Sequence, residues 1–169
     1  MQLGTTQEKL KAVGVETVAV VNTPLTRAQL YYKYRPARVL LAADPEAATH
    51  QVFRVPAGTL VENESDASWA RGTMTMGQLQ SARLNPTGEL LAEPQNPFVA
   101  METLNKRDGF EVTEIDQQIA AAHGLQLTAH FLVDREGIIR WRHIEAAERM
   151  EDLLQFPSDG EILRAARSL

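Results

Sequence analysis

The chain has 169 residues, of which 44% are hydrophobic and 23% charged, a composition typical of one globular domain. Its net charge of −5 disfavours a nucleic-acid partner, and no apolar run approaches the ~20 residues of a membrane helix. The sequence contains no cysteine, so disulfides, thiolate catalysis and cysteine-based metal sites are excluded for these residues. We expect no metal and no cofactor, and without a recognisable secretory signal we expect a cytoplasmic protein.

The first 21 residues predict a helix followed by a strand. Thr5 and Glu8 fit a capping box, and Gly14 is a natural end for a helix over 5–13. The β-branched run Val15–Val21 follows at once and has the length of a strand. Because it is apolar at most positions, it indicates a parallel strand that is covered on both faces.

Residues 22–53 repeat this alternation of helix and strand. Thr23 as N-cap and Pro24 at the first helical position predict the next helix. Val39–Ala43 predicts a second buried strand, and Asp44 opens a short helix that runs to about Phe53. Strands that are joined by helices pair in parallel, so this half predicts the core of an α/β sheet.

Residues 54–127 have weak strand signals and many glycines and prolines. We expect three helical segments, over 113–123 with its cap at Thr113, over 97–104, and over 65–84 in one or two pieces. A loop this long is seldom without structure, so we expect it to pack as a lid or subdomain that covers the face near the hairpin or forms a subunit contact. Its expected apolar anchors are Trp69, Met74, Met76, Phe98 and Phe110.

The C-terminal part predicts a hairpin and a last helix. Ala129–Asp134 and Ile138–Ile144 read as two antiparallel strands joined at Gly137, where a positive φ is needed. Ser158 and Glu161 form a further capping box before the last helix. The whole pattern predicts an α/β sheet with helices on both faces and an antiparallel hairpin at one edge.

Three stretches of the sequence, GVETVAVVNTP, VLLAADPEAATHQVF and FLVDREGIIRW, resemble the redoxin family in the same order. These are the alkyl hydroperoxide reductase and thiol-specific antioxidant proteins, the peroxiredoxin-like branch of the thioredoxin fold. The resemblance covers roughly residues 8–53 and 128–169. It implies one thioredoxin-like domain over 1–169, with a core of 5–53 and 128–169 and a long, mostly helical insertion at 54–127.

The resemblance also implies a chemistry that this chain cannot perform alone. Family members reduce peroxides or disulfides with a cysteine at a helix N-terminus, and a thiol-redox partner regenerates it. Helix 5–13 corresponds to the second half of the family's cysteine-bearing helix, so we expect the cysteine-bearing strand to be missing here. Thr128 stands where thioredoxins carry a cis-proline and many peroxiredoxins an arginine. We therefore expect no catalytic residue.

Asn22, Thr23 and Thr128 are the candidate ligand-binding residues. The resemblance places them at the carboxyl ends of adjacent strands, where open α/β sheets bind ligands. Thr23 is also explained as a helix cap. A basic patch interleaves with acidic residues and indicates a solvated surface: Arg135, Arg140, Arg142 and Arg149 with Glu136, Glu145, Glu148 and Glu151.

Three functions remain open: a redoxin-type oxidoreductase that lacks its cysteine, a non-catalytic thioredoxin-like binding or assembly module, and a small-molecule binder of another α/β type. We favour the first as lineage and the second as the role of this chain. In the family fold, a central strand separates Val15–Val21 from Ala129–Asp134. Without it the two strands pair directly, accept Thr59–Val61, or meet a second copy. We expect the homodimer, supported by an apolar face with Tyr31, Tyr32 and Tyr34.

Overall fold

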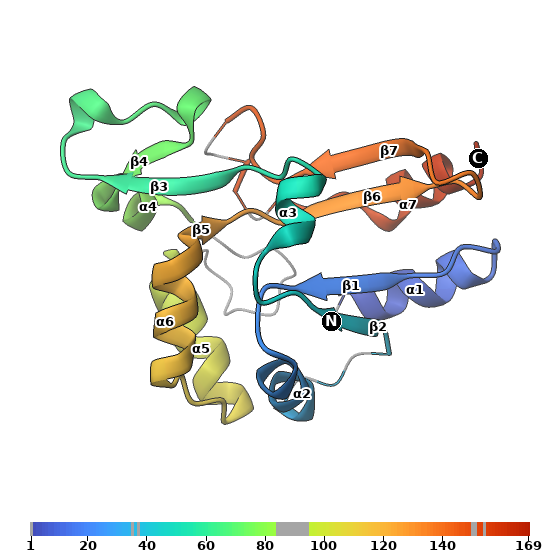
Figure 1. The fold of residues 1–169 in the computed structure, drawn as a ribbon, viewed down its shortest axis with the longest axis horizontal. Helices are drawn as coiled ribbons and strands as arrows, with labels where there is room; N and C mark the ends of the chain where they lie inside the picture. The colour runs from blue at the N-terminus through green and yellow to red at the C-terminus, as the bar shows by residue number, and fades with distance from the viewer. Residues whose placement is uncertain (1, 35, 37, 84–94, 150–151, 154) are drawn as a thin grey trace. The chain divides into compact units, whose positions relative to one another are not determined.

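The chain divides into two units, which are described separately here. Unit 1 comprises residues 1–49, 129–144 and 156–169, and unit 2 comprises 50–128 and 145–155. Figure 1 shows them in a computed structural model, which describes residues 2–34, 36, 38–83, 95–149, 152–153 and 155–169. Over these residues the fold is mixed α/β, with seven α-helices and three small sheets. The single-domain organisation stays a prediction.

Unit 1 contains two separate two-stranded sheets. β1 (Val18–Val21) pairs in parallel with β2 (Leu40–Ala43), and α2 (Leu25–Tyr34) connects them. β6 (Ala129–Val133) pairs antiparallel with β7 (Ile139–Ile144). Among the described residues, neither pair continues into the other. The parallel pair and the hairpin are confirmed. Direct pairing of β1 with β6, one of the three expected ways to join them, is absent among the described residues, and the thioredoxin-like sheet stays a prediction.

The core of unit 1 lies where two helices meet the hairpin. α1 (Gln2–Lys11) and α7 (Asp159–Ala166) contribute apolar side chains that pack on β6. The buried members of this cluster are Leu10, Leu132, Ile162 and Ala166. The predicted cap of α7 is confirmed, because Ser158 N donates to Glu161 Oε2 at 2.8 Å.

Three elements of unit 1 differ from their predicted form. α1 begins at Gln2, so the predicted helix start at Thr5 is wrong, whereas Gly14 has the positive φ (81°) expected at the helix end. β1 and β2 are also shorter than predicted, and burial of these strands on both faces is wrong. Val18 and Leu40 are 53% and 67% exposed.

Unit 2 contains a three-stranded sheet that the sequence analysis missed. Its central strand β3 (Ala57–Val61) pairs in parallel with β4 (Thr73–Thr75) and antiparallel with β5 (Leu125–Gln126). A Cβ at Gly58 would lie 2.7 Å from Cε of Met74, so glycine allows this buried methionine to pack on β3. Because Thr59–Val61 belongs to this sheet, it does not pair with β1 or β6.

The remaining elements of unit 2 are helical. They are η1 (Glu64–Asp66), η2 (Trp69–Arg71), α4 (Met76–Ser81), α5 (Pro97–Asp108) and α6 (Glu114–His123), while α3 (Ala48–Val52) crosses from unit 1. The helix at Thr113 is confirmed, since Asp116 Oδ2 accepts from Thr113 N at 2.7 Å. The segment expected to be helical over 65–84 is instead broken by β4, and its last residue, Leu84, lies outside the described residues.

Unit 2 has a core of its own. Its buried residues are Met74, Leu79, Leu127, Ala146 and Leu153, with Trp69 packed against them. Of the anchors predicted for the insertion, Trp69 and Met74 contribute to this core, whereas Met76 and Phe98 are exposed. Within the described residues, no helix has the length and apolar character that crossing a membrane requires.

Candidate functional site

The carboxyl ends of β1 and β2 bring together two of the predicted ligand-binding residues and one other. Asn22 and Thr23 follow β1 directly, and Asp44 follows β2. Thr23 N and Asp44 N both donate to Val21 O, at 2.9 Å and 2.8 Å. The parallel pairing therefore places Asn22, Thr23 and Asp44 at one edge of the small sheet, as expected for residues that follow parallel strands.

The carboxylate of Asp44 is occupied by the chain itself. It accepts from Ala48 N at 3.1 Å and Thr49 N at 2.7 Å, and also from the Thr49 hydroxyl. These bonds satisfy the first amides of α3, as a cap does, although Asp44 lies four residues before Ala48. The helix start predicted directly after Asp44 is therefore wrong, because α3 begins at Ala48.

Thr128 lies in unit 2, whereas Asn22 and Thr23 lie in unit 1. Its backbone is joined twice to Glu145: Thr128 N donates to Glu145 Oε2 and Glu145 N donates to Thr128 O, both at 2.9 Å. A ligand pocket formed by all three residues stays a prediction.

Glu145 is a buried carboxylate whose sequence context predicts a surface residue. The interleaved arginines and glutamates predict a solvated patch, but only 2% of Glu145 is exposed. A buried carboxylate is costly unless it is hydrogen-bonded, and here the Thr128 amide supplies one such bond. The expectation of a salt-bridged surface does hold for Arg140, whose Nε lies 2.5 Å from Asp134 Oδ2.

The residue after Glu145 has an unusual backbone. Ala146 is buried and has φ +47°, a conformation that L-residues with a Cβ adopt rarely. Its carbonyl oxygen accepts from Trp69 Nε1 at 2.6 Å, which fixes the indole ring against the core of unit 2. Alanine gives no signal for this conformation in the sequence.

A cluster of aromatic rings lies on one face of the β6–β7 hairpin. His130 and His143 are paired across the two strands, with ring centroids 6.0 Å apart. Phe156 meets His130 edge-on at 6.1 Å, and Trp141 stacks with His143 at 6.5 Å. Burial, and then the neighbouring His143, lower the pKa of His130 below its ordinary value of 6.5.

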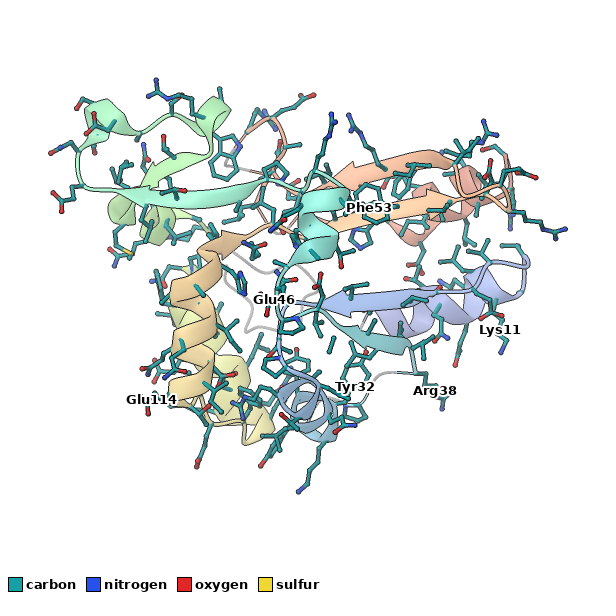
Figure 2. All side chains as sticks on the ribbon, viewed as in Figure 1. Lys11, Tyr32, Arg38, Glu46, Phe53 and Glu114 are labelled. Carbon is teal, nitrogen blue, oxygen red and sulfur yellow. The ribbon has the colours of Figure 1, made fainter. Side chains whose placement is uncertain are left out.

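The tyrosines of α2 are only partly available for a partner. Tyr31 and Tyr32 are half-buried with ring centroids 6.5 Å apart, and burial raises the pKa of Tyr32. Figure 2 shows Tyr32 on α2, and also Arg38 before β2, whose Nη1 lies 2.7 Å from Glu8 Oε1 on α1. Tyr34 is exposed.

The described residues offer binding groups more than reactive ones. Over these residues, no three His, Cys, Asp or Glu side chains are grouped so that they could hold a metal ion. Unit 1 has an apolar strand face, strand edges and the paired imidazole rings of His130 and His143. Comparison of the chain with protein-family models, with curated proteins and with solved structures finds no match.

Proposed function

We propose that this chain is a thioredoxin-like module of redoxin lineage that binds a partner or assembles with a second copy, without thiol chemistry of its own. The observation that carries the proposal is the division of unit 1 into two sheets. β1 and β6, the strands that would flank the family's central strand, are each paired on one side among the described residues. Such edges are sites of association with other chains.

The arrangement of unit 1 supports the redoxin lineage. The order helix, strand, helix, strand gives the parallel pair β1–β2, and the sequence FLVDREGIIRW forms the β6–β7 hairpin. α7 then packs with α1 on the hairpin. These are the elements for which the sequence resembles the family.

The amino-acid composition supports a role in binding. Peroxide reduction by redoxins needs a thiolate that becomes sulfenic acid and is rescued by another thiol. The 169 residues contain no cysteine, and methionine or histidine cannot run this cycle.

A homodimer is the assembly that we propose for the chain. Val18 and Val20 on β1 lie beside Leu40 and Ala42 on β2, and all four side chains are exposed. Parallel sheets are normally covered on both faces, so an uncharged apolar face of this kind favours a partner. These four side chains carry no charge that would repel a second copy, in contrast to the net charge of −5 of the whole chain.

The test combines an activity assay with a measurement of mass. We expect no turnover above buffer in a steady-state peroxide assay with a dithiol reductant, and sedimentation of the protein as a dimer. Turnover well above buffer by the cysteine-free chain would refute the absence of catalysis. A monomer at all accessible concentrations would refute the homodimer.

A further inference from the structure

Two strands of unit 1 have one edge along which no described strand is hydrogen-bonded. β1 is paired with β2 alone, and β6 with β7 alone, over the described residues. Asp44 N donates to Val21 O, so the backbone groups of Val21 face β2. Because successive residues of a strand direct these groups to opposite sides, the amides and carbonyls of Val18 and Val20 face away from β2.

The same alternation identifies the corresponding groups on β6. Glu145 N donates to Thr128 O, which places the backbone of Thr128 toward the β7 side of the hairpin. The next residue, Ala129, is the first of β6 and directs its backbone groups to the opposite side. The outward-facing backbone groups therefore include those of Val18 and Val20 on β1 and those of Ala129 on β6.

One helix contacts β6 and the segment directly before β1. Leu10 on α1 packs against Leu132 on β6, and its carbonyl accepts from Val15 N at 3.0 Å just before β1. The arrows of β1 and β6 point in opposite directions in Figure 1. A strand that enters between them would thus run parallel to one and antiparallel to the other.

Several buried side-chain polar atoms of unit 1 have no hydrogen-bond partner among the described residues. Three of them are Oε1 of Gln7 on α1, Oγ1 of Thr17 directly before β1, and Nδ1 of His130 on β6. Buried polar atoms without a partner are rare in native proteins. These three atoms belong to elements that carry or adjoin the two edges.

We propose that unit 1 binds an extended peptide strand, which pairs with β1 along one edge and with β6 along the other. This inference rests on the proposed function as a binding module and names the element of the partner that is bound. Apolar, β-branched residues at alternate positions fit best, since Val18 and Val20 are their neighbours on β1.

Strands β1 and β6 of a folded second copy do not fill this place. In a copy of this chain, β1 has one edge occupied by β2, and β6 has one edge occupied by β7. Each of these strands can therefore offer a single edge, whereas the strand between β1 and β6 must pair along both of its edges. The occupant is a segment of peptide that is not already part of a sheet.

The experiment uses a synthetic peptide of about seven residues, acetyl-KVTVTVK-amide, which matches the length of a short strand. Its control, acetyl-KVTPTVK-amide, lacks a central N–H because of the proline. Binding to the whole chain is measured by fluorescence anisotropy, and amide hydrogen exchange is followed at Val18, Val20 and Ala129. We expect the first peptide to slow exchange on both strands, and the proline peptide to have no effect.

Two variants at Val18 distinguish an effect on peptide pairing from an effect on the stability of the fold. Val18→Pro removes an N–H that faces away from β2, so it should weaken peptide binding about tenfold and leave the β1–β2 bonds in place. Val18→Thr keeps the N–H and the branched side chain, and should bind like the parent chain. Equal binding by both variants would contradict pairing along β1.

Two results would overturn the inference. Protection of one strand only, growing with protein concentration, would show that a second copy pairs edge to edge. No protection of either strand, even with the peptide tethered to the N-terminus at roughly millimolar effective concentration, would show that no strand is accepted. Neither result touches the proposed lack of catalysis, which the peroxide assay tests separately.

Discussion

Val18 and Leu40 are register partners in the parallel β1–β2 pair, and more than half of each side chain is exposed, at 53% and 67%. Both residues point to the same face of the small sheet, as register partners do. On the other face their neighbours Ala19 and Leu41 are partly buried. Unit 1 therefore presents one apolar face of a parallel sheet to its surroundings.

A charge on this face should separate a dimer. Leu40→Asp would bury an uncompensated carboxylate in the interface, which costs about 2 kcal/mol and weakens the dimer roughly thirtyfold. Because Leu40 is mostly exposed in the single chain, its folding should change little. Sedimentation velocity measures the change. The control is Val52→Asp on α3, another exposed apolar residue, and an equal effect of both variants would contradict a dimer through β1–β2.

Local signals in the sequence predicted several helices and the hairpin turn, but not every helix boundary. The capping pairs at Thr113 and Ser158 join residues that are three apart in the sequence. The positive φ of Gly137 in the hairpin is likewise a local requirement, set by a single residue. The division into three sheets was not predicted, because strand pairing is decided by contacts far apart along the chain. β3 was missed since Gly58 interrupts it and its neighbours have little periodicity.

The candidate site was predicted only in part. Asn22 and Thr23 lie at the end of β1 as expected, because the strand and the helix after it are both local features. Glu145 could not be recognised as buried, since a glutamate among arginines has the sequence pattern of a surface residue. Its partner Thr128 is 17 residues away, and nothing in the sequence links the two.

The stability of unit 1 should depend on the protonation of His130. The pKa of His130 is lowered in the folded protein, so the unfolded chain binds this proton more readily. The contribution of neutral His130 to the free energy of unfolding is fully present above pH 6.5, the ordinary pKa of the group. It decreases as the pH falls from 6.5 toward the lower pKa of the folded state. Urea unfolding at a series of pH values measures this slope.

His130→Phe should flatten the profile below pH 6.5, because phenylalanine keeps a ring beside Phe156 but has no titrating proton. His143 is the group of β7 that faces His130, and Glu161 of α7 interacts electrostatically with His143. Glu161 titrates below its ordinary pKa of 4.5, outside this window. An unchanged slope in His130→Phe would rule out His130 as its source.

The bond between Glu145 and Thr128 should stabilise unit 2. Glu145→Leu keeps a side chain of similar size but leaves the Thr128 amide without its carboxylate acceptor. We expect a loss of about 2 kcal/mol in the free energy of unfolding. Glu148→Ala, at an exposed position, serves as the control and should change stability by less than about 0.5 kcal/mol. A loss no larger than that of the control would mean that the buried bond contributes nothing.

Amide hydrogen exchange along β1 in the chain alone, at low protein concentration, tests most directly whether the strand has an open edge. Ala19 and Val21 face β2, whereas Val18 and Val20 face away from it. We predict that the amides of Val18 and Val20 exchange fast and those of Ala19 and Val21 slowly, a strict alternation along the strand. Slow exchange at all four amides would show that β1 already has a second strand beside it, and would contradict the open sheet on which the proposed binding function depends.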